Sequence, residues 1–388
     1  MCPVLEFNNV HFAYPNSPVS LCGVNFSIKK GTKVALVGPN GAGKTTLLLL
    51  CNGILRPNEG SVLFNGKPIT YDRTSLRDVR KKIGLVFQNS DSQLFAPTVY
   101  QDVAFGPVNL GMDKEDVRAL VTRGLNAVGL AGYEKRPPHQ LSGGEKKRAA
   151  IAGILVMEPE VLIFDEPTSS LDPTGAADLM ELLDELNTQK KTIVISTHDV
   201  ELAYNWADEI ILMNHGMIVH QGTPEAVFTD PRLISTTSLR TPAILEIYAE
   251  LVARKMLDAH DAPKSVLHLV NTLEQRFNCG NHTSGYGSIT VCNVDVVQTE
   301  RIHAWLAQFP AHRRGAMGSR AKSLAEREEI ALDFTYGVID KCILRALIGE
   351  SSVILTSEGM VRRVERRVLA FDDESGIRIP VQMMEANP

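Results

Sequence analysis

Short apolar runs alternate with helical patterns over the first 225 residues. Residues 34–38, 161–165 and 192–197 are rich in β-branched and apolar side chains, as buried strands are. Residues 44–52 follow the first run with a helical pattern, and residues 114–130 place apolar side chains near helical spacing. The pattern predicts a mostly parallel sheet flanked by helices, with a small helical insertion between the early and the later strands.

The last third of the chain changes pattern twice. Residues 242–281 are helical and polar, which predicts a helical connection, and the remainder alternates again between strand and helix patterns. The expected strands cover residues 288–292, 330–334, 353–356 and 377–381, and the expected helices cover residues 300–309, 339–348 and 360–371. We therefore predict one large α/β domain over residues 1–240, a connection over 241–281, and a smaller α/β domain over 282–388.

Composition narrows the classes of partner. The 388 residues carry 40 Lys and Arg against 45 Asp and Glu, a net charge of −5, so no basic excess points to nucleic acid. The longest stretch without charged or strongly polar residues, residues 149–157, is far shorter than the roughly 20 residues that span a bilayer as a helix. The N-terminus lacks the pattern of a secretory signal, so we expect no membrane span and a cytoplasmic protein.

A glycine-rich phosphate-binding motif follows the first predicted strand. Its backbone N–H groups can surround phosphate oxygens, Lys44 can reach the terminal phosphates, and the Thr45 hydroxyl can contact Mg²⁺. The strand before it and the helix after it supply the context that the motif requires, so a turn without a ligand is the weaker interpretation. The loop comprises Gly38, Pro39, Asn40, Gly41, Ala42, Gly43, Lys44, Thr45 and, entering the helix, Thr46.

An acidic pair, Asp165 and Glu166, ends the apolar run of residues 161–164. Asp165 can hold Mg²⁺, and Glu166 can polarise an attacking water. A solvated acidic pair at a strand end would be the better interpretation without the phosphate loop. With the loop present, the pair predicts a nucleotide hydrolysis site.

Further motifs follow in a fixed order and resemble those of ATP-binding-cassette (ABC) ATPases. Leu141 to Glu145 reads LSGGE, the signature of that family, and it lies about 20 residues before Asp165. The other positions that match the family are Tyr14, where an aromatic stacks on adenine, Gln88 of the Q-loop, Ser169 to Asp172 of the D-loop, and the switch histidine His198. The resemblance covers residues 4 to about 225.

The resemblance implies a P-loop cassette with a RecA-like core, a helical subdomain, and ATP hydrolysis with Mg²⁺. It implies catalytic roles for Lys44, Gln88, Glu166 and His198, and Mg²⁺ contacts from Thr45, Gln88 and Asp165. In this family the signature residues Ser142, Gly143 and Gly144 complete the ATP site of another subunit. One cassette with every motif intact would suffice as a homodimer, and a heterodimer stays open.

A finer resemblance, to the energy-coupling-factor branch, lies in residues 88–95 and 99–111. It is most similar to the cobalt and nickel members, and it implies a membrane-embedded coupling subunit, a substrate-binding membrane subunit and a peripheral place on the cytoplasmic membrane face. Ser90, Gln101 and Ser170 depart from the residues common there, and Gln101 puts the identity of the membrane partner in doubt. The alternatives are an importer ATPase for another micronutrient such as a vitamin, a soluble non-transport ABC ATPase, and an inactive cassette.

The region after residue 227 lies outside the resemblance. Val361, Val364, Val368 and Phe371 predict a buried helix face, with four arginines at 362, 363, 366 and 367 on the rest of that helix. We favour a solvated face for these arginines over contact with anionic lipid or nucleotide. Residues 285–288 and 315–319 are glycine loops and weak candidates for a regulatory ligand site, and Cys279 with His282 forms a CxxH pair without further metal ligands. We expect this domain to regulate the cassette or to form oligomers.

Overall fold

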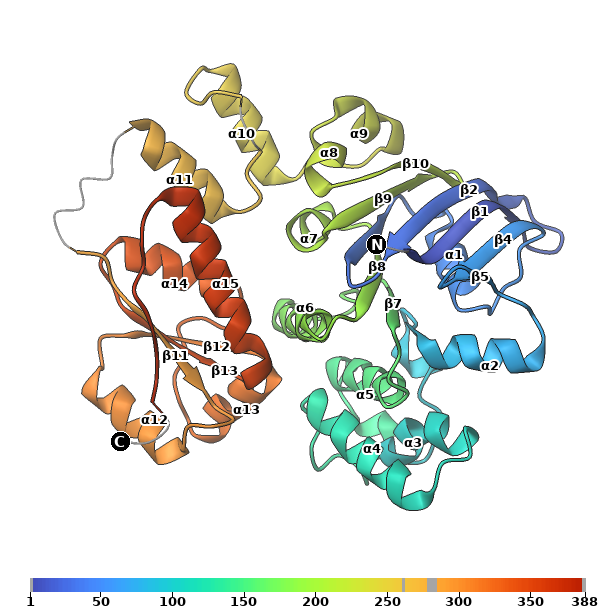
Figure 1. Ribbon diagram of the computed structural model, residues 1–388, viewed down its shortest axis with the longest axis horizontal. Helices are drawn as coiled ribbons and strands as arrows, with labels where there is room; N and C mark the ends of the chain where they lie inside the picture. Colours follow the sequence, from blue (N-terminus) through green and yellow to red (C-terminus); the bar gives the residue numbers. More distant parts are fainter. Residues whose placement is uncertain (1–2, 260–261, 278–284, 386–388) are drawn as a thin grey trace. The chain divides into compact units, whose positions relative to one another are not determined.

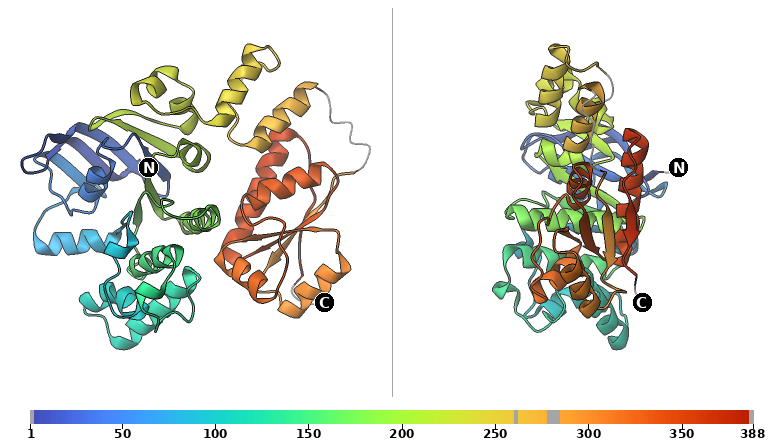
Figure 2. Two further views of the ribbon diagram at one scale, coloured as in Figure 1. Left: turned by 180° about the vertical axis from the view of Figure 1, so that it is seen from behind. Right: turned by 90° about the vertical axis from the view of Figure 1, so that its left-hand side faces the viewer.

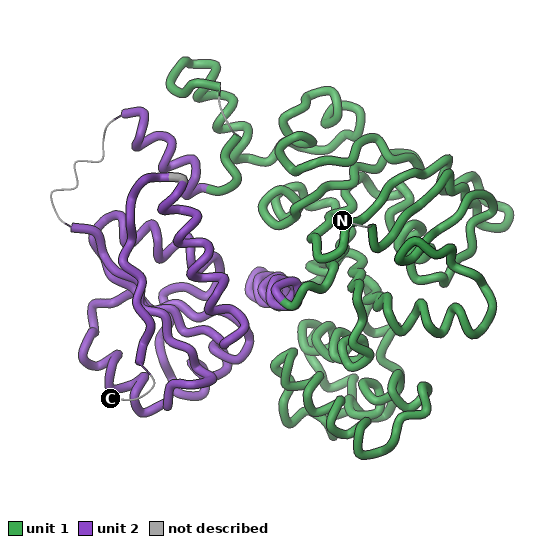
Figure 3. Tube along the Cα trace, viewed as in Figure 1, with its two compact units in different colours: residues 1–171, 189–265 green, residues 172–188, 266–388 purple. Residues whose placement is uncertain are grey.

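The computed structural model describes residues 3–259, 262–277 and 285–385. The chain forms two compact units, shown in Figure 3: unit 1 holds residues 1–171 and 189–265, and unit 2 holds residues 172–188 and 266–388. Unit 2 thus includes helix α6 (Pro173–Thr188), which the chain enters directly from unit 1. The predicted domain boundaries stay a prediction, and Cys279 and His282 lie outside the described residues.

Unit 1 contains a six-stranded sheet in the order β10-β9-β3-β8-β7-β6. All of its neighbouring strands run parallel except β9 and β10, as the apolar runs predict. The strands are β3 (Lys33–Val37), β6 (Ile83–Val86), β7 (Val161–Asp165), β8 (Thr192–Thr197), β9 (Glu209–Asn214) and β10 (Met217–Gly222). Since the functional motifs follow β3, β7 and β8, which are adjacent, the sheet gathers them at one edge.

A second, antiparallel sheet in unit 1 has the order β2-β1-β4-β5 and was not predicted. Its apolar face and the six-stranded sheet share one core with α1 (Lys44–Cys51), which contributes Leu47, Leu48 and Leu50 (Figure 1). Phe7 and Phe26 stack across β1 and β2 with ring centroids 4.5 Å apart. The strands are β1 (Pro3–Ala13), β2 (Val19–Lys29), β4 (Glu59–Phe64) and β5 (Lys67–Pro68).

Helices complete unit 1. The predicted insertion is confirmed as α4, and it packs with α3 and α5. The helices are α2 (Arg73–Lys82), α3 (Val99–Asn109), α4 (Lys114–Ala127), α5 (Gly143–Leu155), α7 (Val200–Trp206), α8 (Pro224–Phe228), α9 (Pro231–Thr237) and α10 (Ala243–Ala253). Among the described residues, no helix is both long and apolar enough to cross a lipid bilayer.

Unit 2 is built on a parallel sheet in the order β12-β13-β11-β14, with helices on both faces (Figure 1 and Figure 2). One face packs against α11, α14 and α15, and the other against α12 and α13. The strands are β11 (Ile289–Asn293), β12 (Arg313–Met317), β13 (Ser352–Thr356) and β14 (Val381–Met383), and the helices are α11 (Val266–Phe277), α12 (Thr299–Gln308), α13 (Ser319–Arg327), α14 (Val338–Leu347) and α15 (Glu358–Ser375).

Two predicted strands of this unit are wrong. Residues 330–334 form no strand; Phe334 makes an isolated bridge to Gly315, and the N–H groups of Asp333 and Phe334 donate to the carbonyl oxygen of Arg314. The strand that the sequence pattern did not predict is β12. It begins with two charged residues, Arg313 and Arg314, and therefore does not form an apolar run. Ile379 packs into the core ahead of the last strand, which pairs with β11 only from Val381 onward.

The arginines of α15 also differ from the favoured interpretation. Val364, Val368 and Phe371 are buried as predicted. However, Arg363 pairs with Asp184 of α6 at 2.6 Å, and Arg367 donates to Asp340 at 2.9 Å. Half of this face therefore consists of ion pairs within unit 2, and Arg362 and Arg366 are exposed.

Candidate functional site

The phosphate loop joins β3 to α1, and a side chain at Gly38 or Gly43 would clash with neighbouring atoms. A Cβ atom at Gly38 would lie 2.4 Å from the carbonyl oxygen of Met213, which no side chain could tolerate. Gly43 has a φ of +98°, in the left-handed region that favours glycine, and it immediately precedes the first residue of α1. This tight path leads the chain directly into a helix N-terminus, where backbone N–H groups can receive an anion.

Lys44 folds back onto the loop that precedes it. Its Nζ donates to the carbonyl oxygens of Gly38 at 2.7 Å and Pro39 at 3.2 Å, and lies 3.9 Å from Glu166 Oε1. Burial lowers the pKa of Lys44, and the carboxylates of Glu166 and Asp165 oppose that shift. A buried ammonium beside the loop amides is suited to meet phosphate oxygens.

Asp165 lies at the end of β7 between two hydroxyl groups. Thr45 Oγ1 donates to its Oδ2 at 2.8 Å, and Ser196 Oγ donates to its Oδ1 at 2.5 Å. The parallel register explains the second contact, because Asp165 on β7 is the partner of Ser196 on β8. The loop threonine and the strand-end aspartate are thus held side by side, as two oxygen donors of the type that Mg²⁺ prefers.

Glu166 is buried and held in an unusual backbone conformation, with φ at +46°. Its N–H donates to Ser196 Oγ at 2.9 Å, and the Ser169 hydroxyl donates to its carbonyl oxygen at 2.7 Å. His198 Nδ1 lies 3.0 and 3.1 Å from the two carboxylate oxygens. The backbone and the side chain are therefore both fixed, as a positioned general base requires.

The remaining motif residues lie at different distances from this cluster. Tyr14 is partly exposed, with its hydroxyl oxygen 3.3 Å from Thr46 Oγ1, so the aromatic ring lies next to the phosphate loop. The Gln88 side chain is exposed, and among the described residues it makes no hydrogen bond with the cluster. The structure brings Lys44, Thr45, Asp165, Glu166 and His198 together and leaves Gln88 outside that network.

The signature residues lie at the start of α5, in a different part of unit 1 from α1 (Figure 1). Ser142 caps the helix, accepting from the Glu145 N–H at 3.3 Å, while Glu145 Oε2 accepts from the Ser142 N–H at 2.7 Å. Ser142 and Gly143 are exposed. An exposed, rigidly capped helix N-terminus is available to a ligand or to a second protein chain.

Two further residues hold the site and were missed from the sequence. Ser196 links Asp165 to the backbone of Glu166, and its place at the end of β8 is the only signal that could have indicated it. Lys147 is buried on α5, and its Nζ donates to the carbonyl oxygens of Phe87 at 3.1 Å and Gln88 at 2.9 Å. Burial lowers the pKa of Lys147 to about 8. This lysine therefore ties the signature helix to the Q-loop backbone.

Comparison with known proteins agrees with this geometry. The family model described as "ABC transporter" matches residues 21–169. The chain is 52% identical to the energy-coupling factor transporter ATP-binding protein EcfA2 of Methanospirillum hungatei over 99% of this chain and 97% of that protein. It is 54% identical to the energy-coupling factor transporter ATP-binding protein EcfA of Methanocaldococcus jannaschii, over 63% of this chain and 88% of that protein.

Solved structures give the same result for unit 1. The structure of cbiO1 from Clostridium perfringens, part of the ABC transporter complex cbiONQ, superposes with a TM-score of 0.56 at 40% identity and covers 65% of this chain and 100% of its own. A dimeric ATP-binding cassette bound to ADP and Pi gives a TM-score of 0.51 at 30% identity over 57% of this chain and 98% of its own. With the phosphate loop, the acidic pair and the signature in place, this chain belongs to the ABC ATPases, in the branch of energy-coupling factor transporter ATP-binding proteins, and it is an ATP-hydrolysing enzyme.

Proposed function

We propose that this ATPase drives an energy-coupling factor importer from the cytoplasmic face of the cell membrane, with cobalt or nickel as the transported ion. The observation that carries the proposal is an exposed apolar ridge on unit 1, next to the Q-loop. The ridge consists of Phe95, Phe105, Val108 and Met112, which are 66%, 51%, 58% and 40% exposed. Contiguous apolar surface of this kind marks a protein–protein interaction site.

The ridge has a defined geometry. Phe105 and Val108 lie three residues apart on α3, and the ring of Phe95 meets that of Phe105 edge to face, with centroids 4.8 Å apart. Asp102 fixes the segment before the helix, accepting from the N–H groups of Phe95 and Ala96 at 2.9 Å each. These contacts hold the apolar side chains of the ridge in place. A docking surface for a helix of a membrane subunit would have this property.

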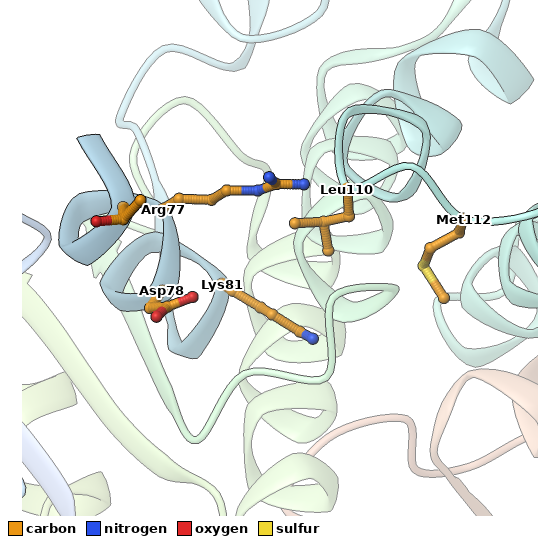
Figure 4. A pocket seen from close by; sticks show the side chains of 6 residues that line it. Arg77, Asp78, Lys81, Leu110 and Met112 are labelled. Carbon is orange, nitrogen blue, oxygen red and sulfur yellow. The ribbon is translucent and has the colours of Figure 1, made fainter.

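A cavity of about 420 Å³ adjoins the ridge between α2 and the end of α3 (Figure 4). Arg77, Asp78 and Lys81 line it from α2, and Leu110 and Met112 line it from the other side. A helix seated on the ridge would place its polar end beside these charged groups. This combination of an apolar surface and a charged rim supports a membrane partner that presents a short amphipathic helix.

The site residues divide the chemistry of hydrolysis among them. The loop N–H groups and Lys44 would bind the β- and γ-phosphates of ATP, and the Tyr14 ring would stack on the adenine. Glu166, oriented by His198, would accept a proton from the water that attacks the γ-phosphorus. The bond from that phosphorus to the bridging oxygen then breaks, which leaves ADP and phosphate. Gln88 would join this site only after the Q-loop moves.

Thr45 and Asp165 fit a magnesium ion, because their oxygen atoms already lie 2.8 Å apart beside the phosphate loop. These two residues, with Gln88, would hold the ion. When bound, Mg²⁺ neutralises charge that develops on the phosphate oxygens. Ser196 would keep the Asp165 carboxylate oriented toward it.

A second copy of the chain would complete each site. Ser142, Gly143 and Gly144 begin α5 and are available on the surface of unit 1, so the helix N-terminus of one copy can face the ATP held by the other copy's Lys44. The dimeric form of the similar solved cassette supports a homodimer. ATP would hold the two copies together, and its hydrolysis would release them.

The experiment is co-purification from detergent-solubilised membranes, compared with a chain that carries Phe105→Asp. We expect two membrane proteins to accompany the unaltered chain, one of them binding cobalt or nickel, and the aspartate variant to lose both while still hydrolysing ATP. Leu369→Asp, at an exposed apolar position of α15, is the matched control.

If the membrane partner that co-purifies binds a vitamin, the transported substrate is a vitamin and not cobalt or nickel. A chain that recovers only soluble proteins would leave it as a non-transport ATPase.

A further inference from the structure

The sheet of unit 2 has a feature that the proposed transport function does not use. In its order β12-β13-β11-β14, β11 is connected through α12 to β12 on one side, and β13 is connected through α15 to β14 on the other. The two connections leave neighbouring strands for opposite faces of the sheet. Parallel sheets bind ligands outside the carboxyl ends of their strands at such a point.

That point lies between β11 and β13, and donor groups converge beside it, between the carboxyl ends of β12 and β13, whose following helices α13 and α15 also lie on opposite faces of the sheet. Gly318 follows β12 and precedes α13, and Ser357 follows β13 and precedes α15. A Cβ atom at Gly318, where φ is +82°, would lie 3.7 Å from Ser357 Oγ, so the two turns meet. Lys322 lies one turn into α13, with only 15% of its side chain exposed. We call this set of Gly318, Lys322 and Ser357 the α13 crevice.

A carboxylate from α6 occupies the α13 crevice, as an anion would. Glu181 Oε2 accepts from the Gly318 N–H at 3.1 Å and lies 2.8 Å from Lys322 Nζ. Asp178 Oδ1 also pairs with Lys322 Nζ, at 2.6 Å. Glu185 Oε2 lies 3.9 Å from the position of a Cβ at Gly318. All of these groups belong to unit 2.

The carboxylates satisfy the crevice only in part. Ser357 is 4% exposed, and its hydroxyl lies near the Glu185 carboxylate without a hydrogen bond of good geometry, although a buried hydroxyl normally makes one. It also makes no capping hydrogen bond to α15. Burial raises the pKa of both Glu181 and Glu185, so these side chains are costly to hold there as anions. The crevice therefore offers a donor and a charge that α6 does not fully use.

We propose that the α13 crevice binds the phosphate group of a small anionic molecule, and that Glu181 holds the phosphate position when that molecule is absent. A phosphate group carries more charge than a carboxylate and has three acceptor oxygens, which suit the Gly318 N–H, the Lys322 ammonium and the Ser357 hydroxyl. Of the predicted glycine loop at residues 315–319, residues 315–317 belong to β12, and Gly318 with the start of α13 contributes to the ligand site.

Binding would release α6, and α6 begins at Pro173, directly after the D-loop residues Ser169 to Asp172. Ser169 in turn donates to the carbonyl oxygen of Glu166. A ligand that displaced Glu181 would therefore act on the helix that continues from the ATP site.

Amide hydrogen exchange of the full chain tests the proposal. The probes are inorganic phosphate, adenosine monophosphate and adenosine, each against sodium chloride at the same ionic strength. We expect phosphate to slow exchange in residues 313–327 and to speed it in residues 173–188. Saturation by inorganic phosphate alone would identify the free ion as sufficient, and a requirement for the monophosphate, with adenosine inactive, would identify a larger phosphorylated ligand.

Two variants and one control variant make the test specific. Ser357→Ala removes a donor that α6 engages only weakly, through Glu185, so it should weaken phosphate binding about tenfold and change exchange in residues 173–188 little without ligand. Lys322→Ala should speed exchange in residues 173–188 before any ligand is added. Arg366→Ala removes an exposed charge from α15 and should change neither. Equal effects of phosphate and chloride, or unaltered phosphate binding by Ser357→Ala, would overturn the proposal.

Discussion

The cassette motifs of unit 1 and the parallel sheet of unit 2 both place polar groups at the carboxyl ends of strands, but they satisfy those groups differently. In unit 1, Asp165 receives hydrogen bonds from Thr45 and Ser196, and Glu166 is held by His198, so these side chains are already fixed in place. In unit 2, the equivalent edge is occupied by carboxylates of α6, and the Ser357 hydroxyl there lacks a well-formed hydrogen bond. The edge in unit 1 holds the residues for ATP hydrolysis. The edge in unit 2 is suited to exchange the Glu181 carboxylate for a phosphate group.

The comparison with relatives follows the same division. The relative from Methanocaldococcus jannaschii matches 63% of this chain, and the relative from Methanospirillum hungatei matches 99%. The family model matches residues 21–169, all of which lie in unit 1. Those residues include the phosphate loop, the signature and the acidic pair, so these motifs of ATP hydrolysis lie in unit 1.

The largest effect should come from Glu166→Gln. Removing the general base should lower ATP turnover by about 10²–10⁴ while ATP binding persists, because Lys44 and the loop amides remain. Phosphate release and equilibrium nucleotide binding measure the two quantities. Glu365→Gln, an exposed acid on α15, is the control and should retain full turnover. A similar loss in both variants would break the assignment of chemistry to unit 1.

Phe371→Ala should separate the stabilities of the two units. Phe371 is fully buried in the core of unit 2, and its truncation should lower the free energy of unfolding there by about 3–5 kcal/mol. The chain has two tryptophans, Trp206 in unit 1 and Trp305 in unit 2. Denaturant unfolding of single-tryptophan chains, made with Trp206→Phe or Trp305→Phe, reports each unit.

The Trp305 transition should move to lower denaturant in the Phe371→Ala background, and the Trp206 transition should stay. A joint shift would mean that the units unfold as one.

Lys147→Met should lower turnover roughly tenfold, because charged hydrogen bonds of about 1.5–3 kcal/mol hold the Q-loop backbone to α5. Steady-state hydrolysis at pH 7 measures this change. Since the pKa of Lys147 is lowered to about 8, the unaltered enzyme should also lose activity as the pH rises through that value. The methionine variant should lack this step, and its persistence would assign the step to another group.

The smallest effect should be a pH dependence of the contact between α6 and the α13 crevice. Burial raises the pKa of Glu181 and Glu185 above the ordinary value of 4.5, so the docked state binds protons more tightly than the released one. The contact should be strongest below pH 4.5 and should weaken as the pH rises through the raised values.

Hydrogen exchange in residues 173–188, corrected for intrinsic rates, should thus rise severalfold across that range. The double variant Glu181→Gln, Glu185→Gln should flatten the profile. An unaltered profile in the double variant would contradict the assignment to these two side chains.

Strands and helices were predictable from the sequence where an apolar pattern and a motif coincide. The strands β3, β7 and β8 are confirmed, as are α1 and α4, because their apolar runs are long and their ends carry the motifs. The strand β12 was not predictable in this way. Arg313 pairs with Glu350 and Asp333, so ion pairs stabilise this strand, and an apolar pattern does not reveal them.

The sequence predicted which residues form the site, but not the hydrogen bonds that connect them. The motifs named Asp165, Glu166 and His198, and the hydrogen bonds between strands β7 and β8 place them together. The roles of Ser196 and Lys147 depend on the register of β8 and on the packing of α5, which are tertiary facts. The roles assigned to Gln88 and to the signature residues stay predictions.

The central claim is that ATP is enclosed between the phosphate loop of one copy and the signature of another. Two Glu166→Gln chains test it, one with Asn40→Cys and one with Ser142→Cys, each with Cys2, Cys22 and Cys279 replaced by serine. Both positions are exposed. Mixed with ATP and a short bis-thiol crosslinker, they should give a covalent product of twice the chain's mass, and ADP should give none. Absence of that product, with ATP bound to both chains, would contradict the account.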